Sequence, residues 1–172
     1  MSGPALAFRA LGASDAAAFL AIRERSLRDD PEAYHSDLSE WQGRLDRVDQ
    51  LFCENVAFGA FSDGVPCGLA VLGITARTGL RRRHKAEVWA VYVTPEQRGR
   101  GIARALMRMV LQEAAQRGYR ALVLTVEAGN RTAVGLYESL GFKRYGVELQ
   151  ATHLRDDVFC DDVLMQCELH GG

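Results

Sequence analysis

Two N-terminal segments repeat apolar side chains every three or four residues, which is typical of helices that bury one face. The first helix is predicted to begin at Ser14, because serine is a favourable N-cap, and to end before Asp29. The second is predicted from about Ser39, with Trp41 and Phe52 among its apolar positions. The N-terminal part of the chain is therefore expected to contain two amphipathic helices.

Short runs of apolar and β-branched residues predict the strands. The predicted strands are Ala5–Ala10, Val56–Ser62, Pro66–Ala76, Ala86–Val93, Ala121–Glu127, Lys143–Gln150 and Val158–Leu169. Asp63-Gly64 separates the second run from the third, and this dipeptide is a strong signal of a two-residue hairpin turn. These two runs are therefore expected to be antiparallel neighbours.

The apolar period changes again after the fourth predicted strand. Apolar positions from Ile102 to Ala114 lie on one helical face, and Gly118 follows as a C-terminal stop. A shorter helix, Asn130–Leu140, follows the next strand. A strand, helix and strand in this order form a right-handed parallel crossover. The predicted class is therefore α/β, with a mixed, mostly antiparallel sheet, a central parallel βαβ unit and helices on both faces.

The composition is that of an ordinary globular protein, with 48% hydrophobic and 25% charged residues in 172 positions. No linker or repeat divides the chain, so residues 1–172 are expected to form a single domain. No segment resembles a membrane span or a secretory signal, which predicts a cytoplasmic protein without a membrane partner. The four cysteines are expected to be reduced thiols, and no metal site is expected, because neither Cys nor His shows zinc-ligand spacing.

The formal net charge of −1 conceals two segments of opposite charge. Residues 77–120 hold eleven Lys and Arg against three acids, a net charge of +8, and residues 24–54 hold nine acids against four arginines, a net charge of −5. A basic centre suits a polyanionic ligand and an acidic flank suits a cationic one, although a solvated surface also explains the acidic flank. Nucleic-acid binding is not expected, because the basic run lacks interleaved aromatic residues.

Glycines and arginines are concentrated at Arg98–Arg104, between a predicted strand and a predicted helix. Acidic residues are favoured in the first turn of a helix, because its free N–H groups and its dipole make that end positive. Here the sequence places three arginines and no acid. These cations repel one another unless an anion is bound, and Gly99 and Gly101 let the backbone approach that anion closely. The segment therefore predicts a site for a phosphate or pyrophosphate.

Three phosphate-binding patterns can be compared with this segment. The dinucleotide pattern GxGxxG, started at Gly99, puts the bulky Arg104 where Gly or Ala packs between helix and strand. The P-loop pattern GxxxxGK[ST] is missing, because no Lys-Ser or Lys-Thr follows any glycine. The third pattern, [R/Q]xxGx[G/A], is matched by Arg98, Gly101 and Ala103. It resembles the pyrophosphate loop of the GNAT acyltransferase superfamily.

Residues on both sides of the loop extend this resemblance. Ala86–Glu96 resembles the strand and turn that lead into the loop in that superfamily. The second GNAT motif is similar to the series Asn130, Ala133, Leu136-Tyr137-Glu138 and Leu140-Gly141-Phe142. The chain therefore resembles acetyl-CoA-dependent N-acetyltransferases of the GNAT superfamily over about residues 86–142, roughly a third of its length.

The resemblance implies that acetyl-CoA is the acyl donor and that its pantetheine chain enters between two parallel strands that splay apart. The loop amides would hold the pyrophosphate, and the backbone of Val91–Val93 would pair with the pantetheine. The basic run Arg81–Lys85 fits a solvated loop better than a phosphate site. The cofactor-binding residues that the resemblance implies are Val91, Tyr92, Val93, Arg98, Gly99, Arg100, Gly101, Ile102, Ala103, Arg104, Asn130 and Tyr137.

Two residues are candidates for catalysis. Tyr137 occupies the motif position at which GNAT enzymes use a tyrosine to protonate the departing thiolate, although its apolar neighbours also allow a purely structural tyrosine. Glu87 is the candidate general base, as in family members with a glutamate on this strand. Other members carry that glutamate on the following strand, where this chain has Thr125. A solvated Glu87 without a catalytic role is the alternative.

The acceptor is expected to be a primary amine of a small molecule or peptide that attacks the thioester directly. Two alternatives stay open: a non-catalytic acyl-CoA-binding sensor with the same fold, and a dinucleotide-binding protein, which Arg104 disfavours. Homodimers are common among such folds, although no residue identifies an interface. The residues predicted to contact the acceptor, and to favour a cationic one, are Asp29, Asp30, Glu32, Tyr34, His35, Asp37 and Trp41.

Overall fold

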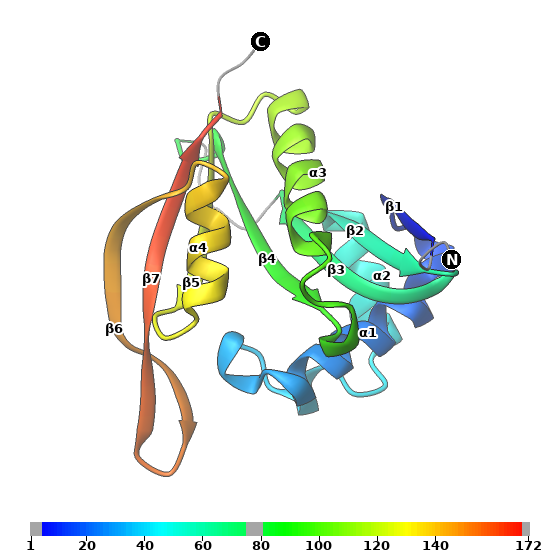
Figure 1. Cartoon of the computed structure of the whole chain (residues 1–172), viewed down its shortest axis with the longest axis horizontal. Helices are drawn as coiled ribbons and strands as arrows, with labels where there is room; N and C mark the ends of the chain where they lie inside the picture. The colour runs from blue at the N-terminus through cyan, green and yellow to red at the C-terminus, as the bar shows by residue number, and fades with distance from the viewer. Residues whose placement is uncertain (1–4, 75–80, 170–172) are drawn as a thin grey trace.

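The computed structural model describes residues 5–74 and 81–169. These residues form a seven-stranded sheet in the order β1-β2-β3-β4-β5-β7-β6 (Figure 1). Neighbouring strands are antiparallel except β4 and β5, which are parallel, so the predicted mixed sheet is confirmed. The strands are β1 (Leu6–Ala10), β2 (Asn55–Ser62), β3 (Val65–Gly73), β4 (Lys85–Val93), β5 (Ala121–Glu127), β6 (Lys143–Arg155) and β7 (Val158–Glu168).

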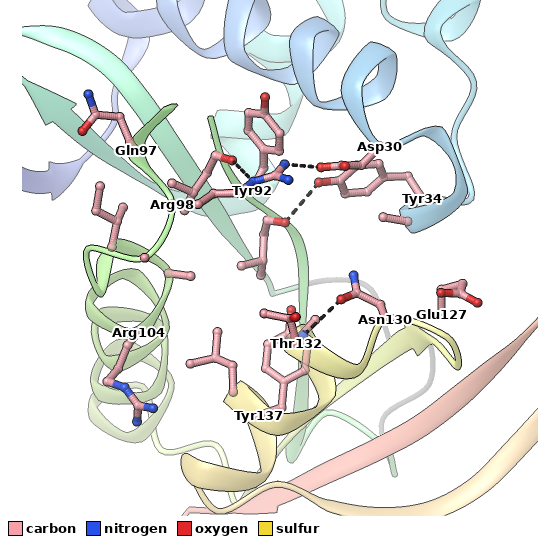
Figure 2. A pocket seen from close by; sticks show the side chains of 18 of the residues that line it. Asp30, Tyr34, Tyr92, Gln97, Arg98, Arg104, Glu127, Asn130, Thr132 and Tyr137 are labelled. Carbon is pink, nitrogen blue, oxygen red and sulfur yellow. Dashed lines mark hydrogen bonds and ion pairs between the residues drawn. The ribbon is translucent and has the colours of Figure 1, made fainter. Parts of the chain in front are cut away.

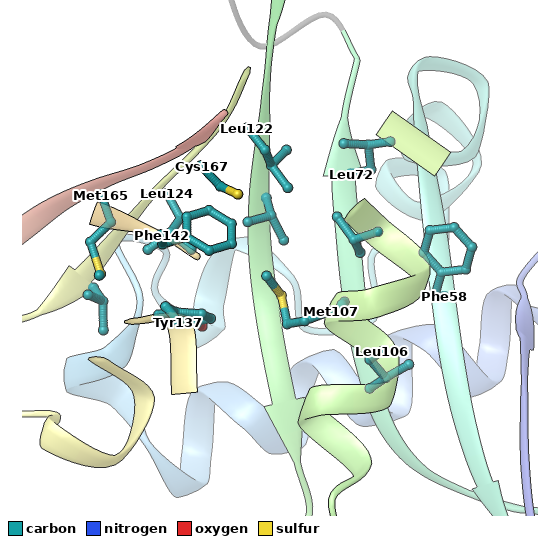
Figure 3. Close-up of a cluster of buried hydrophobic side chains, with 14 of the residues drawn as sticks. Phe58, Leu72, Leu106, Met107, Leu122, Leu124, Tyr137, Phe142, Met165 and Cys167 are labelled. Carbon is teal, nitrogen blue, oxygen red and sulfur yellow. The ribbon is translucent and has the colours of Figure 1, made fainter. Parts of the chain in front are cut away.

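Within the described residues, two α-helices cover each face of the sheet. Helices α1 (Ala16–Asp29) and α2 (Leu45–Glu54) pack on one face, and α3 (Ile102–Gln116) and α4 (Arg131–Ser139) on the other. Leu106 of α3 is fully buried in the second of these layers (Figure 3). Burying such a side chain contributes about 1.5–3 kcal/mol, and this packing fixes α3 across β3 and β4.

Most predicted elements are present, with bounds that differ by a few residues. Asp63 and Gly64 have φ angles of 49° and 81°, the left-handed values of the hairpin turn that the sequence predicts between β2 and β3. The predicted N-cap Ser14 lies instead in a 3-10 turn, η1 (Ala13–Asp15), and α1 begins after it. The predicted end of the third strand, Ala76, lies outside the described residues.

The second helix begins later than the sequence predicts. Ser39 lies in a 3-10 turn, η3 (Leu38–Glu40), which Asp37 caps by accepting a hydrogen bond from the Ser39 N–H group at 2.8 Å. Gly43 then has a φ of 72°, which a right-handed helix does not allow, so α2 starts only at Leu45. Trp41 is therefore outside the helix, although it is only 4% exposed and packs in the core.

Strands β4 and β5 pair over a short distance and then separate (Figure 1). The parallel pairs join Lys85–Glu87 to Ala121–Val123 only. Beyond them β4 carries a bulge at Ala90, whose φ is 53°, and its register with β3 shifts there. A bulge bends a strand and changes the direction of its backbone groups. The part of β4 that ends at Val93 therefore turns away from β5, and no strand among the described residues pairs with its β5-facing edge.

None of the helices in residues 5–74 and 81–169 is long and apolar enough to span a membrane. Within the same residues no three His, Cys, Asp or Glu side chains are grouped as metal ligands would be. All four cysteines are free, and Cys67 and Cys167 are buried.

Candidate active site

The N-terminus of α3 presents backbone N–H groups that the helix does not use. Gly101 is the N-cap and has a φ of 76°, and the φ of Gly99 is 77°. Other L-residues pay about 1–2 kcal/mol for this left-handed conformation, which explains glycine at both positions. The first intrahelical hydrogen bond runs from the Ala105 N–H group to the Gly101 carbonyl oxygen at 3.0 Å. The N–H groups of Ile102–Arg104 therefore lack intrahelical partners and can bind an anion.

The three arginines of the predicted anion site do not share one helical turn, which corrects the sequence-based expectation. Because Gly101 is the N-cap, only Arg104 lies in the first turn of α3, and Arg98 and Arg100 precede the helix. No acidic residue lies in that turn, as predicted. Arg104 makes no hydrogen bond or ion pair with any residue in the described part of the chain, so its guanidinium is available to an anion.

Arg98 and Arg100 already contact other residues. Arg98 donates Nε to the Val93 carbonyl oxygen at 3.0 Å and Nη2 to Oδ2 of Asp30 at 2.5 Å (Figure 2). Arg100 donates Nη1 to Oε1 of Gln97. Arg98 therefore joins the end of β4 to the segment after α1, which positions the glycine loop.

A cavity of about 680 Å³ lies beside this loop; we call it the large cavity. Its walls come from the end of β4, the first turn of α3, the start of α4 and the segment after α1 (Figure 2). All the predicted cofactor-binding residues line it except Arg100. The residues brought together are Val91, Tyr92, Val93, Arg98, Gly99, Gly101, Ile102, Ala103, Arg104, Asn130 and Tyr137.

The side chain of Tyr92 extends from β4 to α1. Its hydroxyl group donates to Oδ2 of Asp29 on α1. Burial and this carboxylate raise the pKa of the Tyr92 phenol. The carbonyl oxygen of Val91, in contrast, accepts a hydrogen bond of 3.1 Å from the hydroxyl group of Tyr34. Burial raises the pKa of Tyr34 to about 12, so this hydroxyl stays protonated at neutral pH.

A second cavity, of about 240 Å³, adjoins the large one; we call it the small cavity. Four carboxylate side chains lie in its wall: Glu32, Glu87, Glu127 and Asp162. Carboxylates favour a bound ammonium group, which suits an amine. The residues shared by both cavities are Glu32, Ala33, Tyr34, Val91, Glu127, Asn130, Ala133 and Tyr137.

Tyr137 lies where the two cavities meet. Its ring is only 7% exposed and packs against Phe142, with ring centroids 5.9 Å apart (Figure 3). Its hydroxyl group makes no hydrogen bond with any residue in the described part of the chain. Burial raises the pKa of the Tyr137 phenol, which keeps it protonated. The ring thus contributes to the core while the hydroxyl group remains available to a ligand in either cavity.

Glu87 lines the small cavity but not the large one. It lies on β4 at the last residue that pairs with β5, and Thr125 of β5 lines the same cavity. Glu87 has no hydrogen-bond or ion-pair partner among the residues that the structure describes. Its carboxylate is therefore uncommitted on the wall of the cavity.

A His–Asp pair that the sequence did not predict also lines the small cavity. Nε2 of His35 lies 2.6 Å from Oδ2 of Asp162, within hydrogen-bond distance, and Asp162 is only 3% exposed. The two residues are 127 positions apart in the chain, so no local pattern could join them.

The other residues predicted to contact the acceptor are divided between the two cavities and the scaffold. Glu32 and Tyr34 line both cavities and His35 lines the small one, whereas Asp30 lines the large cavity and binds Arg98. The remaining three line neither cavity. Asp29 accepts a hydrogen bond from Tyr92, Asp37 caps η3, and Trp41 packs in the core.

Asn130 is the N-cap of α4, as predicted. Its Oδ1 accepts a hydrogen bond of 3.1 Å from the Ala133 N–H group (Figure 2). Asn130 lines both cavities.

Comparison with known proteins places this architecture in a family. The family model described as "Acetyltransferase (GNAT) family" matches residues 19–142. The chain belongs to the GNAT acetyltransferase family. The resemblance seen in the sequence is thereby confirmed. The matched region includes β4, α3 and α4, which line the large cavity, and β4, β5 and α4, which line the small one.

Individual relatives extend the GNAT similarity. The chain is 33% identical over 135 residues to a mycothiol acetyltransferase from Thermobispora bispora, which covers 78% of this chain and 45% of the relative. The chain spans less than half of the length of the curated relatives that it matches.

Two solved structures share the whole fold. A ribosomal-protein-alanine N-acetyltransferase from Brucella melitensis is 27% identical, with a TM-score of 0.77 over 95% of this chain and 99% of that one. A Salmonella typhimurium protein solved with its cofactor acetyl-CoA has a TM-score of 0.79 at 24% identity, over 96% and 95% of the two chains.

Proposed function

We propose that this GNAT protein transfers the acetyl group of acetyl-CoA to a primary amine of a small molecule or peptide. The observation that carries the proposal is the junction at Tyr137. The large cavity contains the anion-binding N-terminus of α3, and the small cavity is lined by carboxylates. They meet at Tyr137, whose hydroxyl group makes no hydrogen bond with the described residues. An acyl donor with phosphates fits the first cavity, and an amine fits the second.

The large cavity fits acetyl-CoA in both charge and size. Its volume of about 680 Å³ is within the usual range of about 300–1,000 Å³ for small-ligand pockets. The N–H groups of Ile102–Arg104 and the Arg104 guanidinium are suited to the pyrophosphate. The free edge of β4 near Val91 and Val93 offers backbone groups to the amides of the pantetheine arm. Acetyl-CoA supplies the activated acetyl group as a thioester.

The proposed reaction is a direct transfer. The amine nitrogen forms a bond to the acetyl carbon and the C–S bond breaks. The nitrogen releases one proton to solvent as the amide forms, and the thiolate of CoA takes the proton of the Tyr137 hydroxyl group. The tyrosine then regains a proton from solvent. No cysteine lines either cavity, so the residues present support direct attack rather than an acyl-enzyme.

An ammonium group must lose a proton before it can attack. We propose Glu87 as the base, because its carboxylate lies in the wall of the small cavity and has no partner in the described part of the chain. His35, held by Asp162, lies in the same wall and is the rival base against which Glu87 is to be compared.

The test is the release of free CoA thiol from acetyl-CoA in the presence of a panel of primary amines. The proposal expects amine-dependent release by the wild-type chain. Tight binding of acetyl-CoA without release for any amine would contradict the transferase and favour the acyl-CoA-binding sensor.

A further inference from the structure

Arg23 is a buried cation without an acidic partner. It lies on α1, is only 2% exposed, and has no carboxylate within 4 Å among the described residues. Among the described residues its one hydrogen bond runs from Nη1 to Oγ of Ser26 at a long 3.4 Å, and its buried Nε has no hydrogen-bond partner there. Burial lowers its pKa to about 10, so it is still protonated at neutral pH.

Three aromatic rings surround the Arg23 guanidinium. Its central carbon lies 4.7 Å from the ring centroid of Tyr34, 5.2 Å from that of Trp41 and 6.0 Å from that of Trp89. Ring faces attract a cation, which offsets part of the cost of burial. They do not satisfy its Nε, however, which is buried without an acceptor among the described residues, and a buried charge with unmade hydrogen bonds is strongly unfavourable. Glu40 is the acid that acts on this charge from a distance, and no carboxylate among the described residues forms an ion pair with Arg23.

Arg23 lines the small cavity together with Tyr34 and Trp89. It is the only Lys or Arg among the described residues in that wall, where the other charged side chains are the four carboxylates. A ligand that matches this wall carries a cation for the carboxylates and an anion for Arg23. A single planar guanidinium suits a carboxylate, whereas the greater negative charge of a phosphate would be repelled by the surrounding acids.

We propose that the small cavity binds an acceptor with both an amine and a carboxylate, an amino-acid-like molecule whose carboxylate pairs with Arg23. This inference rests on the proposed function, because it identifies the substrate class of the same site. The volume of about 240 Å³ is below the range of drug-sized pockets and suits a single amino acid. It also changes the expectation of a purely cationic acceptor, since Arg23 disfavours an amine without an anionic group.

The test compares ligands that differ only in the negative charge. The chain, saturated with CoA, is titrated calorimetrically with each standard amino acid and with its carboxamide. One or more free acids are expected to bind at least tenfold more tightly than the matching amide. Equal affinities for acid and amide throughout, or no binding of any acid, would overturn the inference without relying on any variant.

Two variants of Arg23, with one control variant, identify the residue responsible. Arg23→Met is expected to remove the preference for the acid, and Arg23→Lys to retain part of it. Arg47→Met is the matched control, because Arg47 also stacks on Trp41, at 4.7 Å, but does not line the cavity. Its preference for the acid is expected to equal that of the wild type. Persistence of the preference in Arg23→Met would overturn the assignment.

The release of CoA thiol separates this inference from the proposed function. If amides and acids are acetylated equally well, the transferase stands and the carboxylate site fails. If an acid binds through Arg23 but no amine releases CoA, the carboxylate site stands and the proposed function fails.

Discussion

The hydroxyl group of Tyr34 donates a hydrogen bond of 3.1 Å to the carbonyl oxygen of Val91. Tyr34 follows η2 (Pro31–Ala33), and Val91 lies on the part of β4 that has separated from β5. The bond thus joins the acceptor side of the site to the strand that we propose for pantetheine. A carbonyl oxygen has two lone pairs, so this bond leaves room for a second donor from a ligand.

Replacing Tyr34 by Phe is expected to change how stability depends on pH. Burial raises the pKa of Tyr34 to about 12 in the folded chain, above the ordinary 10.0 of a tyrosine in the unfolded chain. The Tyr34 contribution to stability is therefore complete below pH 10 and lost as pH rises towards 12. A difference of two pKa units between the folded and unfolded chain corresponds to about 2–3 kcal/mol in the free energy of unfolding. Urea unfolding between pH 8 and pH 12 measures this, and the free energy of unfolding of Tyr34→Phe should fall less steeply than that of the wild type.

At pH 8 the same variant should be less stable by about 1 kcal/mol, because it lacks the hydrogen bond to Val91. Parallel curves for the two proteins from pH 8 to pH 12 would mean that Tyr34 titrates as an exposed tyrosine, against its observed burial.

Arg104→Gln is expected to weaken acetyl-CoA binding about tenfold or more. Hydrogen bonds to charged groups contribute about 1.5–3 kcal/mol, and Arg104 lines the large cavity without a partner in the described residues. The loss should shrink at high salt, since the interaction is electrostatic. Arg108→Gln, one turn further along α3, is the matched control, because Arg108 is exposed and does not line the cavity. Similar losses in both variants would count against an anion site at the helix terminus.

Tyr137→Phe is expected to keep the affinity for acetyl-CoA and to lower turnover about tenfold or more. The hydroxyl group has no partner in the described residues, so its removal should cost little stability, while the ring keeps its contact with Phe142. Tyr119→Phe is the control; its hydroxyl donates to the Ile74 carbonyl oxygen at 3.4 Å, away from both cavities. Unchanged turnover in Tyr137→Phe would make this tyrosine purely structural.

Glu87→Gln is expected to lower kcat/KM for the amine about 100-fold, because general bases contribute about 10²–10⁴-fold. It is also expected to change the acidic limb of the plot of kcat/KM against pH. His35→Gln should leave that limb in place. The opposite result, an altered limb in His35→Gln and an unchanged one in Glu87→Gln, would assign the base to the pair of His35 and Asp162 instead.

The parts of the site that the sequence predicted are those set by local backbone chemistry. Gly99 and Gly101 adopt left-handed conformations within one turn, and the cap at Asn130 involves an N–H group three residues away. Both can be read from adjacent residues. The same local reasoning failed at Ser39, because Asp37 caps a 3-10 turn and Gly43 interrupts the apolar period before the helix can start.

The parts that the sequence missed depend on tertiary packing. Asp162 lies near His35 because β7 pairs with β5 in the sheet. The sequence around either residue does not indicate the other. Arg23 had a signal that could have been used, since it is four residues from both Phe19 and Leu27 and therefore lies on the apolar face of its helix. A charge at such a position indicates either a buried partner or a ligand.

A calorimetric titration of the chain with acetyl-CoA, with NAD as the control ligand, tests the central claim most directly. The anion site at the start of α3 and the separated strands β4 and β5 predict tight binding of acetyl-CoA and none of NAD. Binding of NAD in competition with acetyl-CoA, or no binding of acetyl-CoA to the folded chain, would contradict the account of the large cavity and the mechanism built on it.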